Sequence, residues 1–256
     1  MPRALAGERL DRAIPALAPS ISRTRARKLI EGGAVFVDRV RIRVCSRGVH
    51  PGQTVTCYQL AAPAAGEPRV VHDAADLVVI DKPVGMAVEP TRAGATGTLA
   101  AWLRKALPGA LTTHRLDAPT SGLCLCARGD AARAEVNRML AAHEIRRSYL
   151  AVVSPAPAWD ELRLDAALDG RPAVTLARVT VRQDGAALLA LELETGRTRQ
   201  IRRHLAGAGV PIVGDRATPA REAPRLMLHA ARLRLLWRAQ EIDIQCPPPT
   251  GFQILT

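Results

Sequence analysis

The chain has 256 residues and a formal net charge of +12, because 36 lysines and arginines stand against 24 acidic residues. This length allows a buried core in one large or two modest domains. The charge favours nucleic acid over a membrane as partner, since no basic amphipathic helix with aromatic anchors is present. An alanine- and arginine-rich composition without a binding purpose is the alternative explanation. Aromatic residues make up 3% of the chain, which argues against an extended stacking platform for single strands.

The N-terminal charges and the cysteine pattern bear on location and cofactors. Glu8, Arg9, Asp11 and Arg12 precede any apolar run, which argues against a signal peptide, and no apolar stretch reaches transmembrane length. Five cysteines without a Cys-x-x-Cys pair favour neither a zinc site nor a disulfide framework. We therefore expect a cytoplasmic protein that binds neither a metal nor a membrane.

The first 60 residues predict two short helices followed by strands. Apolar residues over 10–17 have helical spacing, although Pro15 must shorten or kink that helix. A second helix is expected over 23–31, capped by Ser22 and ended by Gly32-Gly33. Alternating apolar residues then predict strands at 35–37, 40–44 and 54–58.

The second predicted helix carries four basic side chains, those of Arg23, Arg25, Arg27 and Lys28. A charge run on a helix is more often a solvated face, but here charge, element order and partner class agree, so we expect these residues to bind RNA phosphates. The helix-helix-strand order resembles the S-four-type (S4) RNA-binding module, on residues 9–11, Ser22-Arg23 and residues 32–37. Asp38-Arg39 replaces the Asn-Gly turn usual in that family, which predicts a longer or differently twisted hairpin.

Composition predicts a linker over residues 61–74, which contain Pro63, Gly66 and Pro68. It separates an RNA-binding domain, residues 1–60, from a second domain, residues 75–256. The second domain mixes apolar strands with helices, and spacing alone gives an α+β fold class. Strands are expected at 77–80, 123–127, 148–153, 174–181, 187–194, 226–236 and 242–244, and helices at 98–106, 130–142 and 199–205.

A single carboxylate lies between basic and small residues in the segment His114-Arg115-Leu116-Asp117-Ala118-Pro119-Thr120-Ser121-Gly122. Pro119 and Gly122 place Asp117 in a loop that leads into an apolar strand. An acid beside an arginine at the mouth of a strand stays ionised at neutral pH and can act as a nucleophile. The alternative is an aspartate that closes a turn and pairs with Arg115, the more frequent role of a loop acid.

This nonamer resembles the active-site signature of the RluA family of RNA pseudouridine synthases, which reads His-Arg-Leu-Asp, two variable positions and Thr-Ser-Gly before an apolar strand. Further matching segments follow in the family's order: 77–83 with Gly85, 148–153, 195–202 and 225–230. The resemblance covers most of the chain from residue 75 onwards. It implies a catalytic domain with a central mixed, largely antiparallel sheet, flanking helices and an active-site cleft across the sheet.

The resemblance also implies the reaction. The uridine glycosidic bond breaks, the uracil rotates, and ribose is rejoined to carbon instead of nitrogen. Nothing is oxidised and no group leaves, so no cofactor is expected, in keeping with the absence of dinucleotide-binding, P-loop and metal-cluster motifs. Asp117 is the implied catalytic carboxylate, and attack on the anomeric carbon, attack on the uracil ring and electrostatic stabilisation all fit.

Further roles follow from the same resemblance. Tyr149, which as a strand tyrosine would ordinarily be core packing, matches the residue that packs against the flipped base and takes the proton from carbon five. Arg202 matches the arginine that pairs with the carboxylate. Arg115 matches the residue that displaces the base. Arg197, with the N-terminus of the following helix, is expected to bind phosphate.

Some positions depart from the family pattern. Arg199 replaces a usual histidine and is expected, with Arg203 in place of a shorter apolar residue, to add charge near the cleft. Gly214-Asp215 is retained, but residues 216–219 lack the usual aromatic residue and glycine. The histidines at 114, 204 and 229 do not form a ligand set by spacing, and we expect them to support the core or the site.

The sequence therefore predicts a monomeric RNA pseudouridine synthase with an appended RNA-binding module, and favours large-subunit rRNA as its target. A tRNA target is one alternative. A catalytically silent RNA-binding or ribosome-assembly factor is another, favoured by the departures from the family pattern. The presence of Asp117, Tyr149 and Arg202 together favours the enzyme.

Overall fold

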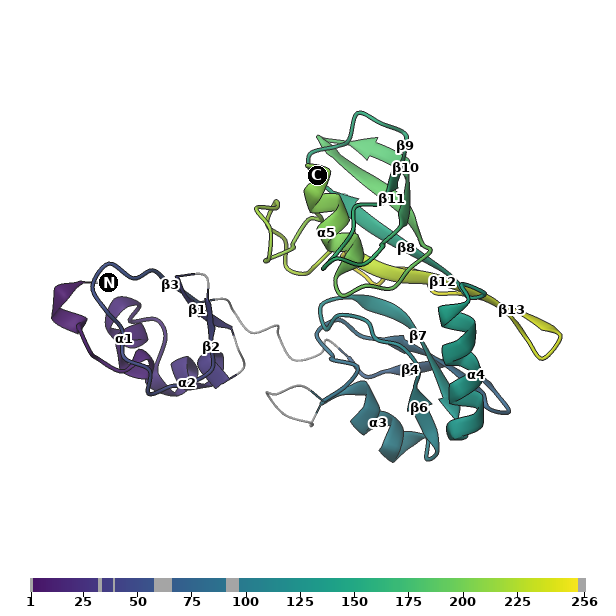
Figure 1. The fold of residues 1–256 in the computed structure, drawn as a ribbon, viewed down its shortest axis with the longest axis horizontal. Coiled ribbons are helices and arrows are strands. Elements are labelled where there is room, and N and C mark those ends of the chain that lie inside the picture. Colours follow the sequence, from purple (N-terminus) through teal and green to yellow (C-terminus); the bar gives the residue numbers. More distant parts are fainter. Residues whose placement is uncertain (1, 32–33, 39, 58–65, 91–96, 253–256) are drawn as a thin grey trace. The chain divides into compact units, whose positions relative to one another are not determined.

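The computed structural model describes residues 2–31, 34–38, 40–57, 66–90 and 97–252. The chain folds into two compact units (Figure 1). The first is formed mainly by Met1–Ala62, and the second by Pro63–Glu89 together with Thr96–Thr256. Within the described ranges, no helix is long and apolar enough to cross a bilayer.

The first unit packs two helices against a three-stranded antiparallel sheet with strand order β2-β1-β3. Its elements are a short 3-10 helix (Arg3–Leu5), α1 (Leu10–Leu17), α2 (Arg23–Glu31), β1 (Val35–Val37), β2 (Val40–Ile42) and β3 (Val55–Cys57). Leu10, Ile14 and Ile30 form its core with strand residues. Pro15 lies inside α1 without ending it, and the Ser22 hydroxyl accepts the Arg25 N–H at 3.3 Å, as expected of a cap. The predicted Gly32-Gly33 helix end and Arg39 lie outside the described residues.

The second unit is built on a ten-stranded mixed sheet in its described part, with main path β4-β5-β7-β12-β8-β11-β10-β9. Among the strand pairs of the described residues, only β7 and β12 run parallel, so the predicted largely antiparallel sheet is confirmed. The strands are β4 (Arg69–Ala74), β5 (Leu77–Lys82), β6 (Ala110–Thr112), β7 (Ser121–Arg128), β8 (Arg146–Val153), β9 (Glu161–Leu164), β10 (Thr175–Gln183), β11 (Ala186–Leu193), β12 (Leu228–Trp237) and β13 (Gln240–Gln245).

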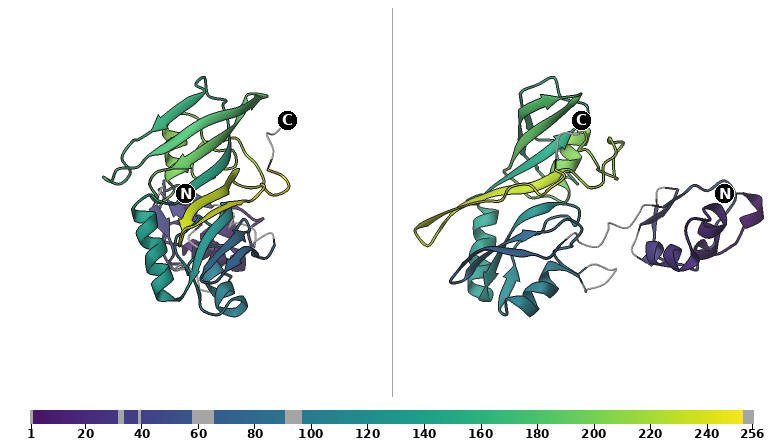
Figure 2. Two further views of the ribbon diagram at one scale, coloured as in Figure 1. Left: turned by 90° about the vertical axis from the view of Figure 1, so that its right-hand side faces the viewer. Right: turned by 180° about the vertical axis from the view of Figure 1, so that it is seen from behind.

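Three helices pack on this sheet: α3 (Leu99–Ala106) near β6, α4 (Gly129–Ala141) on β7 and α5 (Gln200–Gly207) against β10 (Figure 2). Strand β5 contributes apolar side chains to both faces of the sheet, since alternate residues of a strand point to opposite faces. Leu77 and Val79 pack in the cluster with α4, whereas Val78 and Ile80 pack in the cluster with α3 and α5. The central strands are therefore covered on both sides.

Most predicted elements of the second unit are present within a few residues of their expected bounds. The linker needs a correction, because Arg69–Ala74 of the predicted 61–74 linker forms β4, which pairs with β5. This strand is short, polar and largely exposed, so it lacks the apolar alternation that marks a strand in sequence. Strands β6 and β9 were missed for a different reason: each has only three or four residues, too few to show a period.

Gly122 allows the strand after Asp117 to approach β12. It lies opposite Ala230 in the parallel β7–β12 pair and has φ +105°. A Cβ atom at this position would lie 2.2 Å from the carbonyl oxygen of Ala230, a severe clash with backbone. Only glycine satisfies both the conformation and the space.

We expect Gly122→Ala to destabilise the second unit by about 3 kcal/mol, because left-handed strain and a backbone clash add together. Gly109→Ala is the matched control, since Gly109 has φ +86° but open space around its Cβ position. It should lose only about 1 kcal/mol. Equal losses in urea unfolding would show that the close approach at Gly122 does not matter.

Candidate active site

A cleft of about 440 Å³ lies in the second unit. Its walls come from the 112–120 segment, from β8, and from the turn that leads into α5. It brings together six residues singled out in the sequence: Arg115, Asp117, Tyr149, Arg197, Arg199 and Arg202. These residues span 87 positions (202 minus 115), so the folded sheet rather than sequence proximity assembles the site.

Arg202, near the start of α5, joins two carboxylates. Its Nη1 donates to Asp117 Oδ2 at 3.0 Å, while Nε and Nη2 donate to Asp215 at 2.8 and 2.6 Å. The Asp215 side chain is 1% exposed and that of Arg202 is 10% exposed. Burial opposes the charge of Arg202, but the ion pairs with Asp215 and Asp117 outweigh it and raise the Arg202 pKa. The guanidinium is therefore fixed in place and always charged.

Asp117 is positioned by this contact rather than by its own turn. Its backbone carbonyl accepts the Thr120 N–H at 3.0 Å, so a turn is present, but its carboxylate pairs with Arg202. The alternative pairing with Arg115 is not formed, and Arg115 is exposed. Oδ1 of Asp117 has no hydrogen-bond partner among the described residues, in a side chain that lines the cleft. One carboxylate oxygen is thus held and the other is available to a substrate.

Asp215 was not predicted as a site residue. The only sequence signal was the retained Gly214-Asp215 turn. Its Oδ1 also accepts the Ala217 N–H at 3.0 Å, and its backbone carbonyl accepts from Thr218 at 3.3 Å. The altered 216–219 segment therefore still forms the turn that surrounds Asp215.

A buried lysine supports the Asp117 loop from below. Lys82 is fully buried, and its Nζ donates to the carbonyl oxygens of Pro83, Met86 and Ala118 at 3.0, 2.9 and 3.4 Å. The Ala118 carbonyl also accepts the Gly85 N–H at 2.7 Å. Burial lowers the pKa of Lys82 to about 8. The Lys-Pro-x-Gly segment thus fixes the residue that follows Asp117.

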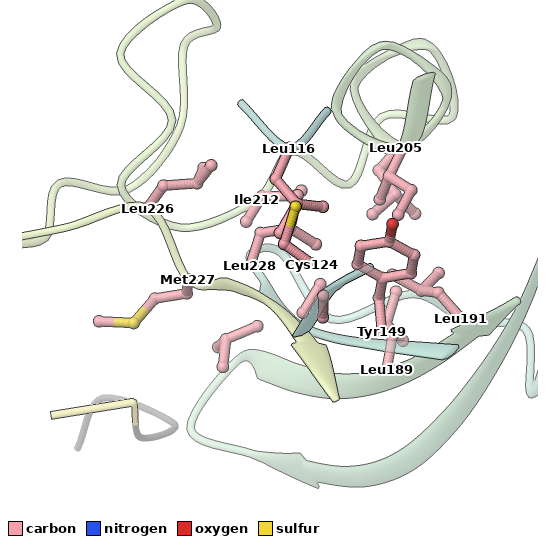
Figure 3. Close-up of a cluster of buried hydrophobic side chains, with 14 of the residues drawn as sticks. Leu116, Cys124, Tyr149, Leu189, Leu191, Leu205, Ile212, Leu226, Met227 and Leu228 are labelled. Carbon is pink, nitrogen blue, oxygen red and sulfur yellow. The ribbon is translucent and has the colours of Figure 1, made fainter. Parts of the chain in front are cut away.

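Tyr149 lies at the apolar base of the cleft on β8. Its ring packs among Leu116, Leu191 and Leu205, and the residue is 6% exposed (Figure 3). Burial raises the pKa of its hydroxyl, so the phenol is neutral at physiological pH. The side chain thus offers a flat apolar surface and one neutral oxygen at the cleft.

The arginines around the turn into α5 differ in their contacts. Arg197 Nε donates to the Pro172 carbonyl at 2.9 Å, and its backbone N–H donates to Gln200 Oε1 at 2.9 Å. Arg199 is exposed in a left-handed conformation with φ 54°. The expectation that Arg203 adds charge near the cleft is wrong, because it pairs with Asp169 at 2.8 Å and does not line the cleft. Consecutive residues of an α-helix point in different directions, so Arg202 and Arg203 lie on different sides of α5.

The three histidines have structural contacts. His114 Nε2 accepts the Leu125 N–H at 3.0 Å, which requires an unprotonated nitrogen, and burial lowers its pKa to about 3. The rings of His204 and His229 bond to Thr175 and Ser121, each at about 3 Å. Within the described ranges no cluster of potential ligands could hold a metal ion.

In the first unit, the four basic residues of α2 have different environments. Arg23 donates to the fully buried carboxylate of Asp11 at 3.2 Å, which Arg9 also contacts, and the pKa of Asp11 is lowered by the hydrogen bond from Arg9 and then by Arg23. Arg27 lies 4.0 Å from Glu31. The exposed side chains of Arg25 and Lys28 have no ion-pair or hydrogen-bond partner in the described part of the chain.

Comparison with known proteins agrees with this fold. Residues 76–207 match the RNA pseudouridylate synthase family and residues 8–55 match the S4 domain. The chain is 36% identical over 242 residues to ribosomal large subunit pseudouridine synthase D of Xanthomonas campestris, covering 84% of this chain and 72% of that one. It is also 36% identical over 293 residues to an uncharacterized RNA pseudouridine synthase of Chloroflexus aurantiacus, covering 100% and 91%.

Solved structures share the fold of the catalytic unit. Human RNA pseudouridylate synthase domain containing 1 matches with a TM-score of 0.62 at 24% identity, over 72% of this chain and 84% of that chain. The fold is thus that of a pseudouridine synthase with an N-terminal S4 domain. With the sequence matches, this means that the chain belongs to the RNA pseudouridylate synthase family, and the predicted resemblance to RluA-type enzymes is confirmed.

The neutral state of His114 leads to a prediction about pH. Its pKa is about 3 in the folded protein, against about 6.5 in an unfolded chain. Below pH 6.5 the unfolded chain takes up a proton that the native chain does not, so the free energy of unfolding falls as pH falls. From pH 7.5 to pH 5, wild type should lose about 2 kcal/mol more than His114→Gln.

Glutamine is chosen because its oxygen can also accept the Leu125 N–H. All three tryptophans lie at positions 102, 159 and 237, so tryptophan fluorescence during urea unfolding reports the second unit. Parallel pH profiles for the two proteins would contradict a buried neutral histidine.

Proposed function

We propose that this RNA pseudouridine synthase modifies uridines of large-subunit ribosomal RNA and that Asp117 is its catalytic carboxylate. The observation that carries the proposal is the geometry of Asp117. Arg202 holds Oδ2 at 3.0 Å, while Oδ1 is without a partner among the described residues and the side chain lines the cleft. A carboxylate held at one oxygen in a cleft with apolar residues suits attack on a bound nucleoside.

The reaction balances without an external group. The bond from C1′ of ribose to N1 of uracil breaks, a bond from C1′ to C5 forms, the proton on C5 leaves and N1 gains a proton. Asp117 acts at the reacting centre as nucleophile or charge stabiliser, and Arg202 keeps it oriented. Every role is assigned to a side chain, so the proposal includes no cofactor.

The target base must leave the RNA stack to reach the cleft. We assign Arg115, which is exposed at the cleft, to displace the base, and Tyr149 to support the base from below. The raised pKa of Tyr149 opposes formation of a phenolate, so a neutral Tyr149 can relay the C5 proton only by giving its own hydroxyl proton to water as it accepts the proton from C5. Arg197 and Arg199 are proposed to contact the RNA backbone at the turn into α5.

The rRNA target rests on the relatives, several of which are named ribosomal large subunit pseudouridine synthase D. A tRNA target is the second candidate, and the S4 domain, which recognises RNA, serves either. A catalytically silent assembly factor is disfavoured because Asp117, Tyr149 and Arg202 meet in one cleft. The proposal also includes a cytoplasmic monomer, as the sequence predicts. Mapping pseudouridines in total RNA from cells with and without this protein tests the target: loss from 23S-type rRNA supports it, and loss only from tRNA overturns it.

Asp117→Asn should reduce turnover to the assay floor, because it keeps the side-chain volume but removes the charged nucleophilic oxygen. RNA affinity should stay near wild type, since affinity is spread over many phosphate contacts. The readout is tritium release from C5 of labelled uridine in RNA, beside a binding assay on the same preparation. Asparagine also suits a turn, so substantial release by this variant would mean that Asp117 is a turn residue.

The S4 domain should supply affinity through the unpaired cations of α2. Replacing Arg25 and Lys28 by alanine removes up to two phosphate contacts, each worth about 0.7 to 0.9 in the slope of log affinity against log salt. Turnover at saturating RNA should change little. The matched control is Arg12→Ala, an exposed residue already near Glu8 at 3.8 Å, which should leave the slope unchanged.

Arg23 is expected to act differently from its neighbours. Arg23→Ala removes one of two partners of the buried Asp11 carboxylate and should lower the stability of the first unit.

If the Arg25 and Lys28 double variant keeps the wild-type salt slope, the side chains of Arg25 and Lys28 are merely solvated.

A further inference from the structure

Arg147 is a charged residue of the cleft without a described partner. It lies on β8 two positions before Tyr149, so both side chains are on the same face of the strand, and both line the cleft. Its Nε atom is buried and has no hydrogen-bond partner, and the side chain forms no ion pair with any described residue. A guanidinium cannot shed its proton at physiological pH, so the charge is present.

Each of the other arginines of the cleft either has a hydrogen-bond partner or is exposed to water. Arg202 is paired with two carboxylates, Arg197 donates to a backbone carbonyl, and Arg115 and Arg199 are exposed to water. Arg147 is half-buried, and its Nε atom has neither a partner among the described residues nor access to water. Burying a guanidinium atom without a partner is costly, and in a cleft that admits a substrate a bound ligand can supply the partner.

The guanidinium of Arg147 lies between Tyr149 and the turn that leads into α5. A Cβ atom on Gly196 would lie 3.0 Å from Arg147 Nη1, so the glycine leaves room for the guanidinium beside the turn. On the other side, its positive charge acts on Tyr149 and His114: it adds to the effect of burial that lowers the pKa of His114, and it partly offsets the effect of burial that raises the pKa of Tyr149. The guanidinium therefore lies inside the cleft rather than on the outer surface.

We propose that Arg147 binds one of the two phosphates that flank the target uridine and so fixes the backbone of the flipped nucleotide. This inference rests on the proposed function. Phosphate suits the site because its two free oxygens match the planar fork of a guanidinium. A phosphate is also negative before the reaction begins, so its binding compensates the buried charge, which a neutral uracil carbonyl does not.

The first test measures RNA affinity in an Asp117→Asn background, in which no turnover is expected. The probe is a short RNA around the mapped uridine, made with normal phosphates and with a neutral methylphosphonate on the 5′ or the 3′ side of that uridine. On normal RNA, Arg147→Gln should weaken binding about tenfold or more, the range of a charged hydrogen bond. On one of the methylphosphonate RNAs it should cause no further loss.

Two variants control this experiment. Arg146→Gln changes the exposed neighbour on the same strand, which does not line the cleft, and should act equally on all three RNAs. Arg147→Lys keeps the charge and should restore part of the affinity for normal RNA, which a purely structural role would not do. Equal losses on all three RNAs for Arg147→Gln, or no loss on any, would overturn the inference.

A second test needs no turnover and no known target. The Nε–Hε NMR signal of Arg147, assigned by its absence from Arg147→Lys, is followed during titration with uridine 3′,5′-bisphosphate and, separately, with uridine. A saturable shift with the bisphosphate alone supports the inference. An equal response to uridine, or none to either probe, overturns it. If wild type modifies no RNA while the bisphosphate shift is present, the proposed function fails and the phosphate site stands.

Discussion

The catalytic unit depends on one guanidinium that holds two carboxylates in a largely buried site. Arg202 contacts Asp117 through one nitrogen and Asp215 through two, and the three groups carry a net charge of −1. Charges removed from water are tolerated only when their partners are well placed, and breaking such a set costs about 3 to 5 kcal/mol. The positions of α5, of the Asp117 loop and of the 214–218 turn are therefore mutually dependent.

The backbone segments that carry Asp117 and Asp215 are held in place by close contacts. Gly214 has φ +76°, and a Cβ atom there would lie 1.9 Å from the Arg225 carbonyl oxygen, so the turn that presents Asp215 requires glycine. On the other side, Lys82 and Gly85 hold the Ala118 carbonyl, and Gly122 fixes the start of β7 against β12. The segment that carries Asp117 is thus held at both ends and in the middle. A rigid carboxylate of this kind is what positioning catalysis requires.

Local patterns predicted much of this molecule. The buried strands β5, β7, β8 and β11 have continuous apolar runs, and the dense motif around Asp117 identified the family. Contacts between distant segments were harder to predict. The pairing of Arg202 with Asp117 spans 85 positions and was expected only through the family resemblance, and the role of Asp215 was missed because its signal was a two-residue turn. The contact of Arg23 with Asp11 was also not predicted, because it depends on how α1 and α2 pack. Short polar strands such as β4 have too few apolar residues to be recognised.

Because Arg202 contacts both carboxylates, we infer that Asp215 acts through Arg202 to orient Asp117, and the single-turnover rate constant of Asp215→Asn measures this effect. Asp169→Asn is the matched control, because it weakens an exposed pair with Arg203, the next residue of the same helix. Both variants are measured on a saturating RNA substrate, well below their melting temperatures. We expect Asp215→Asn to lower the rate constant at least about tenfold while RNA affinity is retained, a change of about 1.4 kcal/mol in the barrier. Asp169→Asn should have no effect. A folded Asp215→Asn protein with the wild-type rate constant would contradict this inference.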